Sequence, residues 1–251
     1  VLEIIVNRQD VKAGMLSYIL TTQKGRPKVV AQDIQLILLA MDEKGEGIPK
    51  SLWGQKPDAS RFLPRGGATR YAVKKDDLVS LGTVVVNDGF RIMGATMSNI
   101  AGKDNRTVAF IDENSRLRIA AGANEMWRSL TRVGGGLAQA HLQENVLRTT
   151  VDRFFKVEPN PIAVDLDGDG TQEVVVAVND EEAGRLAVVY RSPAGFRMQV
   201  VASGFEGMVT GLGAIPSEGG SPSLVAAVVK RTTNLLLQTK GETQIIMTVP
   251  E

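Results

Sequence analysis

Residues 162–190 read IAVDLDGDGTQEVVVAVNDEEAGRLAVVY, and this stretch carries both the fold pattern and the sharpest motif of the chain. An acidic loop with glycines leads into an aliphatic run, Val174–Val178, followed by a polar turn and a second run, Leu186–Tyr190. Short β-branched runs bounded by turn-forming residues are typical of β-strands. The stretch therefore predicts a loop followed by an antiparallel pair of strands.

The same order of loop, strand, turn and strand occurs at two other places. Asn99–Thr107 leads into Val108–Ile111 and then Arg116–Ile119, and a looser copy runs from a loop at Gly211–Ser223 into Leu224–Val229. A repeat of ~40–50 residues with up to four strands is what a propeller blade requires. We therefore predict an all-β fold, a β-propeller of antiparallel four-stranded blades. It would form a single domain over residues 1–251, with about five to seven blades that need not all be complete.

Other segments extend this prediction. Further strands are expected at Leu2–Val6, Leu16–Thr21, Val29–Val30, Ile34–Met41, Tyr71–Val73, Leu78–Val86, Met198–Val201, Leu235–Gln238 and Ile245–Val249. One short helix is expected over residues 137–147, and residues 54–70, which are rich in Gly, Pro and Arg, are expected to form a long loop. Asp42–Gly47 with the following Leu52-Trp53 is interpreted as the end of an earlier blade.

The composition excludes several kinds of protein. The chain has 251 residues, 43% hydrophobic and 23% charged, as in ordinary globular proteins, and its net charge of +1 argues against a nucleic-acid binder. It has no cysteine and a single histidine, His141, which excludes disulfide scaffolds, thiol nucleophiles and multi-histidine metal sites within one chain. No apolar run approaches the ~20 residues of a transmembrane helix. Because the chain starts at Val1, we expect that a signal or lipid anchor has been removed, or that these residues belong to a longer protein.

The acidic loop has the donor pattern of a calcium site. Asp165, Asp167 and Asp169 occupy positions 1, 3 and 5 of the loop, Thr171 offers its carbonyl at position 7, and Glu173 stands at position 9. Calcium takes six to eight oxygen ligands, whereas the same carboxylates without a cation would repel one another. We predict one structural Ca²⁺ bound by these five residues. An acidic surface turn that binds nothing is the alternative.

This motif resembles a known repeat. Asp-x-Asp-x-Asp-Gly-x-x-Glu entering a run of valines, with Pro161–Val164 before it, is similar to the FG-GAP or VCBS repeat. Met126–Ser129 followed by Gly134–Gly136 is similar to the blade ends of secreted or lipid-anchored bacterial VCBS proteins. The resemblance implies a β-propeller with calcium between the first two strands of a blade. It also implies a periplasmic or extracellular location in a bacterial envelope.

The repeat at 99–107 departs from this family pattern. Asn99, Ala101, Lys103 and Thr107 stand where the acidic loop has its four carboxylates, so this loop is predicted to bind no calcium. Lys103 could place its ammonium near the ion, although solvent exposure is the simpler expectation. The 211–223 segment also lacks the carboxylate series.

Nothing in the sequence assembles a catalytic set. His141 is the only imidazole, and no Gly-x-Ser-x-Gly elbow or phosphate-binding glycine loop is present. We therefore predict a non-enzymatic module that binds protein partners of the envelope, without nucleic acid. The alternative is a carbohydrate-binding or carbohydrate-active propeller with a polysaccharide as its partner. Its candidate residues are Asp42-Glu43, Asp76-Asp77, Asp180–Glu182, Trp53 and Trp127, with basic residues Arg61, Arg65, Arg70, Lys74 and Lys75.

Overall fold

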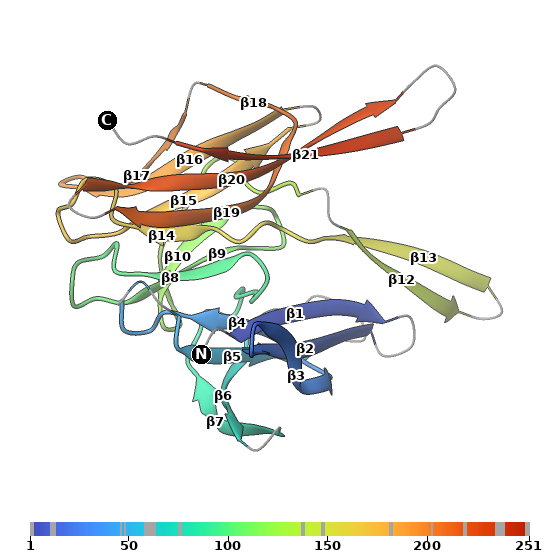
Figure 1. The fold of residues 1–251 in the computed structure, drawn as a ribbon. Coiled ribbons are helices and arrows are strands. Elements are labelled where there is room, and N and C mark those ends of the chain that lie inside the picture. The colour runs from blue at the N-terminus through green and yellow to red at the C-terminus, as the bar shows by residue number, and fades with distance from the viewer. Residues whose placement is uncertain are drawn as a thin grey trace.

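A computed structural model gives the fold of the chain (Figure 1). It describes residues 3–10, 14–45, 47, 49–57, 64–74, 77–136, 139–146, 149–180, 183–201, 203–217, 220–233 and 239–248. These ranges contain 21 β-strands, and every strand pairs with its neighbours in antiparallel orientation. No helix occurs in these ranges. The predicted all-β class is therefore confirmed.

Five sheets of three to five strands follow one another along the chain, and a two-stranded hairpin stands between the third and the fourth. Blade 1 consists of β1 (Glu3–Asp10), β2 (Gly14–Gln23) and β3 (Arg26–Ile34). Blade 2 consists of β4 (Ile37–Met41), β5 (Ser51–Gln55), β6 (Ala68–Lys74) and β7 (Asp77–Val84). Blade 3 consists of β8 (Ala95–Ser98), β9 (Thr107–Ile111), β10 (Leu117–Ala121) and β11 (Asn124–Arg128).

The hairpin and the last two blades complete the fold. The hairpin is β12 (Gln139–Val146) with β13 (Thr149–Lys156). Blade 4 consists of β14 (Ile162–Val164), β15 (Glu173–Asn179), β16 (Ala183–Ser192) and β17 (Gly195–Val200), with β18 (Phe205–Glu206) also paired to β16. Blade 5 consists of β19 (Met208–Ser217), β20 (Gly220–Thr233) and β21 (Thr239–Met247). These five sheets are arranged as the blades of a five-bladed β-propeller.

Four hydrophobic layers hold consecutive blades together. Leu38 and Ile19 belong to the layer between blades 1 and 2, and Trp53, Phe90 and Phe110 to the layer between blades 2 and 3. The layer between blades 3 and 4 includes Ile111, Leu117, Val174 and Val176. The layer between blades 4 and 5 includes Val175, Ala177, Ala226 and Val228. The alternation along β15 explains how one strand serves two layers, since successive side chains point to opposite faces of a sheet.

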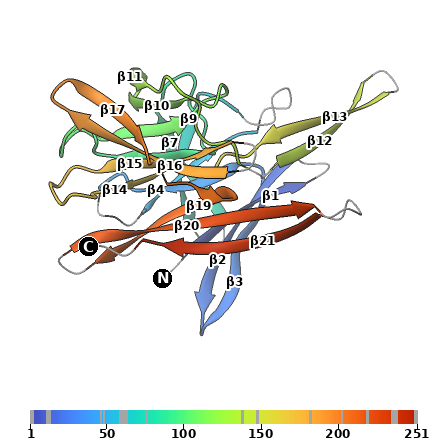
Figure 2. The same cartoon turned by 90° about the horizontal axis from the view of Figure 1, so that it is seen from above.

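The helix expected over residues 137–147 is wrong. Residues 139–146 form β12, which pairs with β13 from Gln139↔Lys156 to Val146↔Thr149. A short apolar pattern does not by itself distinguish a helix from a strand. Here the segment forms a strand because β13, just downstream, pairs with it. Figures 1 and 2 show this hairpin projecting from the side of the molecule, away from the blades.

Three other boundaries differ from the sequence-based expectation. The single strand expected at Ile34–Met41 is two strands, because Asp33 has a φ of 56° and the chain turns before β4 begins. The loop expected at 54–70 is shorter, since β5 extends to Gln55 and β6 begins at Ala68. The loop expected at Gly211–Ser223 lies mostly within β19 and β20. The strand expected at Leu235–Gln238 lies outside the described residues.

Candidate metal site in blade 4

The acidic segment, residues 165–172, connects the first two strands of blade 4. β14 ends at Val164, and β15 starts at Glu173, which pairs with Val164. The whole segment is therefore the loop at one end of this strand pair. Gly168 and Gly170 have φ values of 77° and 84°, which lie in the left-handed region that favours glycine. The two glycines let the chain curl back onto its own carboxylates.

Backbone amides of the loop fix its aspartates. Asp165 accepts hydrogen bonds from Gly168 N and Gly170 N, each at 2.8 Å. Asp167 Oδ1 accepts from Asp169 N at 3.1 Å, and Asp169 Oδ1 accepts from Thr171 N at 2.6 Å. Aspartates commonly make such bonds in turns. They set the direction of each side chain before any ion is considered.

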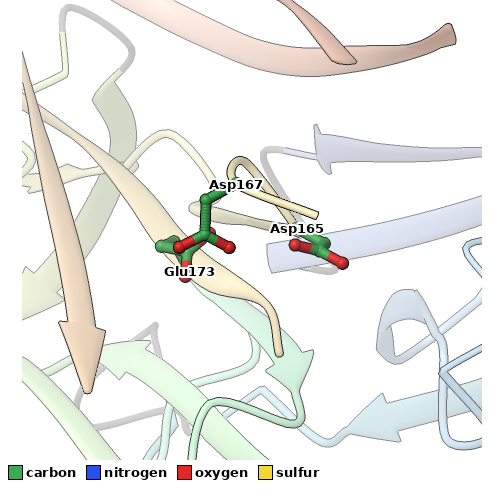
Figure 3. A group of neighbouring side chains, drawn as sticks. All are labelled: Asp165, Asp167 and Glu173. Atoms are coloured by element: carbon green, nitrogen blue, oxygen red, sulfur yellow. The ribbon is translucent and has the colours of Figure 1, made fainter. Parts of the chain in front are cut away.

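Three carboxylates converge. One oxygen each of Asp165, Asp167 and Glu173 lie within 4.8 Å of one another, and Figure 3 shows these side chains around the loop. Ligand distances to calcium are about 2.3–2.6 Å, so two oxygens on opposite sides of one ion stand about 4.8 Å apart. The spacing of the cluster therefore fits one calcium ion. The structure brings together three of the five predicted ligands, whereas Asp169 and Thr171 stay predictions.

Glu173 is the buried member of the cluster. It is 9% exposed and accepts a hydrogen bond from Leu166 N at 2.8 Å. Burial raises the pKa of Glu173, the bond from Leu166 opposes that rise, and the charges of Asp167 and Asp165 add to it. Its ionised form is thus disfavoured by its surroundings, and a cation between the three carboxylates would reverse this.

A hollow of about 510 Å³ opens beside the cluster. One wall is the acidic loop, with Asp167, Asp169 and Glu173, and the other is the β16–β17 hairpin, with Tyr190 and Pro193. Arg191 from that hairpin donates a hydrogen bond to the carbonyl of Ala101 in blade 3. The site is therefore open on one side, which leaves room for water or another ligand to complete a coordination shell.

The corresponding loop of blade 3 has the same length. Residues 99–106 lie between β8 and β9 as residues 165–172 lie between β14 and β15, and Thr107 starts β9 where Glu173 starts β15. The alignment of Asn99 with Asp165 is therefore correct. Lys103 is exposed, as expected, and a Cβ added at Gly170 would lie 2.6 Å from its Nζ. Its ammonium thus lies against the acidic loop of the next blade.

Hydrogen bonds join the two loops. Asn99 Oδ1 accepts from Gln172 N at 2.7 Å, and Asn99 Nδ2 donates to Gly170 O at 3.1 Å. Gln172 Oε1 accepts from Asn99 N and from Arg106 Nη1, both at 3.2 Å. Asn99, which stands in blade 3 where blade 4 has Asp165, therefore holds the backbone of the acidic loop in blade 4.

Blade 2 has a third loop of this kind, which the sequence interpretation missed. Asp42 accepts hydrogen bonds from Gly45 N and Gly47 N, each at 2.8 Å, with the same residue spacing as Asp165, Gly168 and Gly170. Asp42 is therefore the start of the first loop of blade 2 and not the end of an earlier blade. The shared spacing Asp-x-x-Gly-x-Gly was the available signal. Lys44 stands where the acidic loop has Asp167.

The other predicted candidates are mostly structural. Trp53 is buried and donates to Glu43 Oε1 at 2.7 Å, and Trp127 packs against Phe196. Of the basic residues, Arg65 pairs with Glu113 and Arg70 with Glu43. Several candidates, or their side chains, lie outside the described residues: Arg61, Lys75, Asp76, His141, Glu181 and Glu182.

No protein-family model matches the chain, and the search of curated proteins found no match either. Among the described residues, no helix has the length and apolar character needed to cross a membrane.

Proposed function

We propose that this chain is a calcium-stabilised β-propeller of the FG-GAP or VCBS type, which serves as a protein-interaction or assembly module of a bacterial envelope. The convergence of Asp165, Asp167 and Glu173 carries the proposal. Three carboxylates this close, one of them nearly buried, are costly without a cation. Lys103 lies beside Gly170 of this loop, but none of the ion pairs among the described residues involves the three carboxylates.

Calcium fits the donor set better than other ions. All the donors are oxygens, which excludes a preference for soft metals, and the loop has the irregular, partly open geometry that calcium tolerates. Magnesium would require a near-octahedral cage at shorter distances. When bound, calcium would neutralise the three carboxylates and fix the first loop of blade 4. That loop contacts Asn99 and Arg106 of blade 3, so the ion would also stabilise the contact between the two blades.

An interaction role is favoured over carbohydrate chemistry. Propellers occur both as enzymes and as binding modules, so the fold is compatible with either. Sugar sites use exposed aromatic rings, whereas Trp53 lies in the layer between blades 2 and 3. The envelope location follows from the family resemblance and from the abundance of calcium outside the cell, where weak sites are filled.

Thermal unfolding with calcium and with EGTA tests the metal site. At about 100 times the dissociation constant, calcium should stabilise the wild-type chain by about 2.7 kcal/mol, which raises Tm by roughly 5–11 °C in a chain of this size. Asp167→Ala should abolish this difference. Asp104→Ala, which removes an exposed aspartate from the neighbouring loop, should keep it. An equal Tm of the wild type in both buffers would refute the site, and an equal gain with magnesium would refute the choice of ion.

A glycan array and a screen of chromogenic glycosides test the role. Neither binding nor turnover is expected. Site-specific crosslinking in a bacterial envelope should instead yield a defined protein adduct that is lost with Asp167→Ala. Turnover of any glycoside would overturn the non-enzymatic proposal, while leaving the calcium site itself untouched.

A further inference from the structure

The first loop of blade 3 lacks the carboxylate series of blade 4, but it places two cations on the loops beside it. Arg106 lies on the blade 2 side, where it donates to the carbonyl of Asp42 and where a Cβ added at Gly45 would meet its Nη1 at 2.7 Å. Lys103 lies on the blade 4 side, where a Cβ added at Gly170 would meet its Cε at 2.5 Å and its Nζ at 2.6 Å. The blade 3 loop therefore supplies positive charge to both neighbouring loops.

The two cations are held differently. Arg106 is half-buried, and its guanidinium is bonded both to Asp42 O and, at 3.2 Å, to Gln172 Oε1. Lys103 is exposed, and within the described part of the chain its side chain takes part in no hydrogen bond or ion pair. Arg106 is therefore a fixed part of the contact between blades, whereas the Lys103 ammonium is not held in one place over the acidic loop.

The Lys103 ammonium stands close enough to the acidic cluster to act on a bound ion. Because a Cβ at Gly170 would meet Nζ at 2.6 Å, Nζ lies within about 4 Å of the Cα of that glycine. Gly170 N donates to Asp165 Oδ2 at 2.8 Å, and a calcium ion would lie about 2.3–2.6 Å from a carboxylate oxygen that binds it. The ammonium and the ion would thus be roughly 5–10 Å apart, a separation at which physiological salt only partly screens two charges.

We propose that Lys103 sets the calcium affinity of the blade 4 site, an inference that rests on the calcium site proposed above. Its ammonium partly compensates the three carboxylates when no ion is bound, and it opposes the ion when one is bound. Lysine carries its charge on a flexible four-carbon chain, so the ammonium can approach Asp165, Asp167 and Glu173 in the ion-free state and withdraw when calcium binds. Blade 3 thereby controls how readily blade 4 takes up its ion, and the site fills at a higher calcium concentration than its carboxylates alone would require.

Coulomb's law gives the size of the effect. One positive charge acting on a divalent ion at this distance, in a solvent-exposed setting, changes the calcium affinity by about two- to six-fold. Lys103→Met removes the charge and keeps the length of the side chain, so calcium should bind more tightly by that factor. Lys103→Glu reverses the charge and should tighten binding further, whereas Lys103→Arg keeps the charge and should leave the affinity near that of the wild type. Lys28→Met removes an exposed lysine of β3, in blade 1, and is the matched control.

Titration calorimetry with calcium at about 20 mM and about 500 mM NaCl tests the role of the charge. The gain in affinity of Lys103→Met over the wild type should be present at low salt and shrink at high salt, and Lys28→Met should match the wild type in both. Equal affinities of Lys103→Met and the wild type at low salt would overturn this inference and leave the calcium site in place. Absence of calcium binding by every variant would overturn the site and this inference together. Binding by Lys103→Met but not by the wild type would support the inference and contradict a calcium-bound wild type.

Thermal unfolding separates this role from one in packing. In EGTA, Lys103→Met should have a lower Tm than the wild type, because the three carboxylates lose a compensating charge. At the same excess of calcium its Tm should reach or exceed that of the wild type, because the tighter site gains more from the ion. Loss of a packing contact alone would lower Tm equally in both buffers, and that result would overturn the inference.

Discussion

Gly134 provides a sharp test of how the blades are held together. It lies between β11 and β12 with a φ of 76°, donates to Ala177 O at 2.7 Å and accepts from Asn179 N at 3.0 Å. A Cβ at this position would lie 2.1 Å from Glu158 Oε2. Glu158 is 6% exposed and accepts a hydrogen bond from Gly135 N at 2.6 Å. Gly134→Ala must therefore displace a buried carboxylate from its donor.

Two terms give the expected destabilisation. A non-glycine residue in the left-handed region costs about 1–2 kcal/mol. Loss of the bond between the Glu158 carboxylate and Gly135 N, both poorly solvated, costs about 1–3 kcal/mol more. The sum for Gly134→Ala is about 2–5 kcal/mol, or a fall of roughly 1–2 M in the urea midpoint. Gly25→Ala is the matched control, because Gly25 has a φ of 73° and no atom within 4 Å of the added Cβ.

Urea unfolding of Gly134→Ala, Gly25→Ala and a double-mutant cycle with Glu158→Ala separates the two terms. In the Glu158→Ala background the clash is gone, so Gly134→Ala should cost only as much as Gly25→Ala. The cycle should then give a coupling of about 1–3 kcal/mol. If Gly134→Ala is no more destabilising than Gly25→Ala, or if the two substitutions are additive, the argument from the clash fails.

Two further predictions concern the loops of blades 2 and 3. Burial opposes ionisation of Glu43, but hydrogen bonds from Ser51 and Arg70 outweigh it and lower the pKa below 4.5. The extra stability of wild type over Glu43→Gln should therefore be complete above pH 4.5 and disappear as the pH falls through the lowered pKa, as urea unfolding at pH 7 and pH 3 would show. Asn99→Ala removes the bonds that hold Gly170 and Gln172 N, so calcium affinity measured by titration calorimetry should fall several-fold. Unchanged affinity would contradict the support role.

Local patterns were enough to predict most of the strands and the acidic loop. In the strand segments, apolar and polar residues alternate or all residues are aliphatic. The loops between them contain turn-forming residues such as Gly, Pro, Asn and Asp. Residues 99–107 align with residues 165–173 without a gap, because each loop has eight residues and connects the first two strands of its blade. These features depend on neighbours within a few positions, and sequence contains that information directly.

The features that were missed depend on partners or on the backbone. β12 is a strand because β13 follows it, and no helical periodicity test detects a partner. The Asp42 loop could not be predicted from a series of carboxylates, because Lys44 interrupts that series. What the loops of blades 2 and 4 share is the bonding of one aspartate to two glycine amides. The conformation thus persists where the ligands do not.

Hydrogen bonds between the loops suggest how one ion bound in blade 4, as proposed, would affect all three loops. Arg106, the last residue of the blade 3 loop, donates to the carbonyl of Asp42, the first residue of the blade 2 loop. Gln172, at the same position in blade 4, bonds with Asn99, the first residue of the blade 3 loop. The loops of blades 3 and 4 are therefore each bonded to the first residue of the preceding loop. In blade 2 and blade 3 Lys44 and Lys103 stand where the acidic loop has Asp167 and Asp169, and within the described residues the carboxylate cluster lies in the blade 4 loop. A single ion there would act on the whole series, since fixing Gln172 fixes Asn99 and Arg106 in turn.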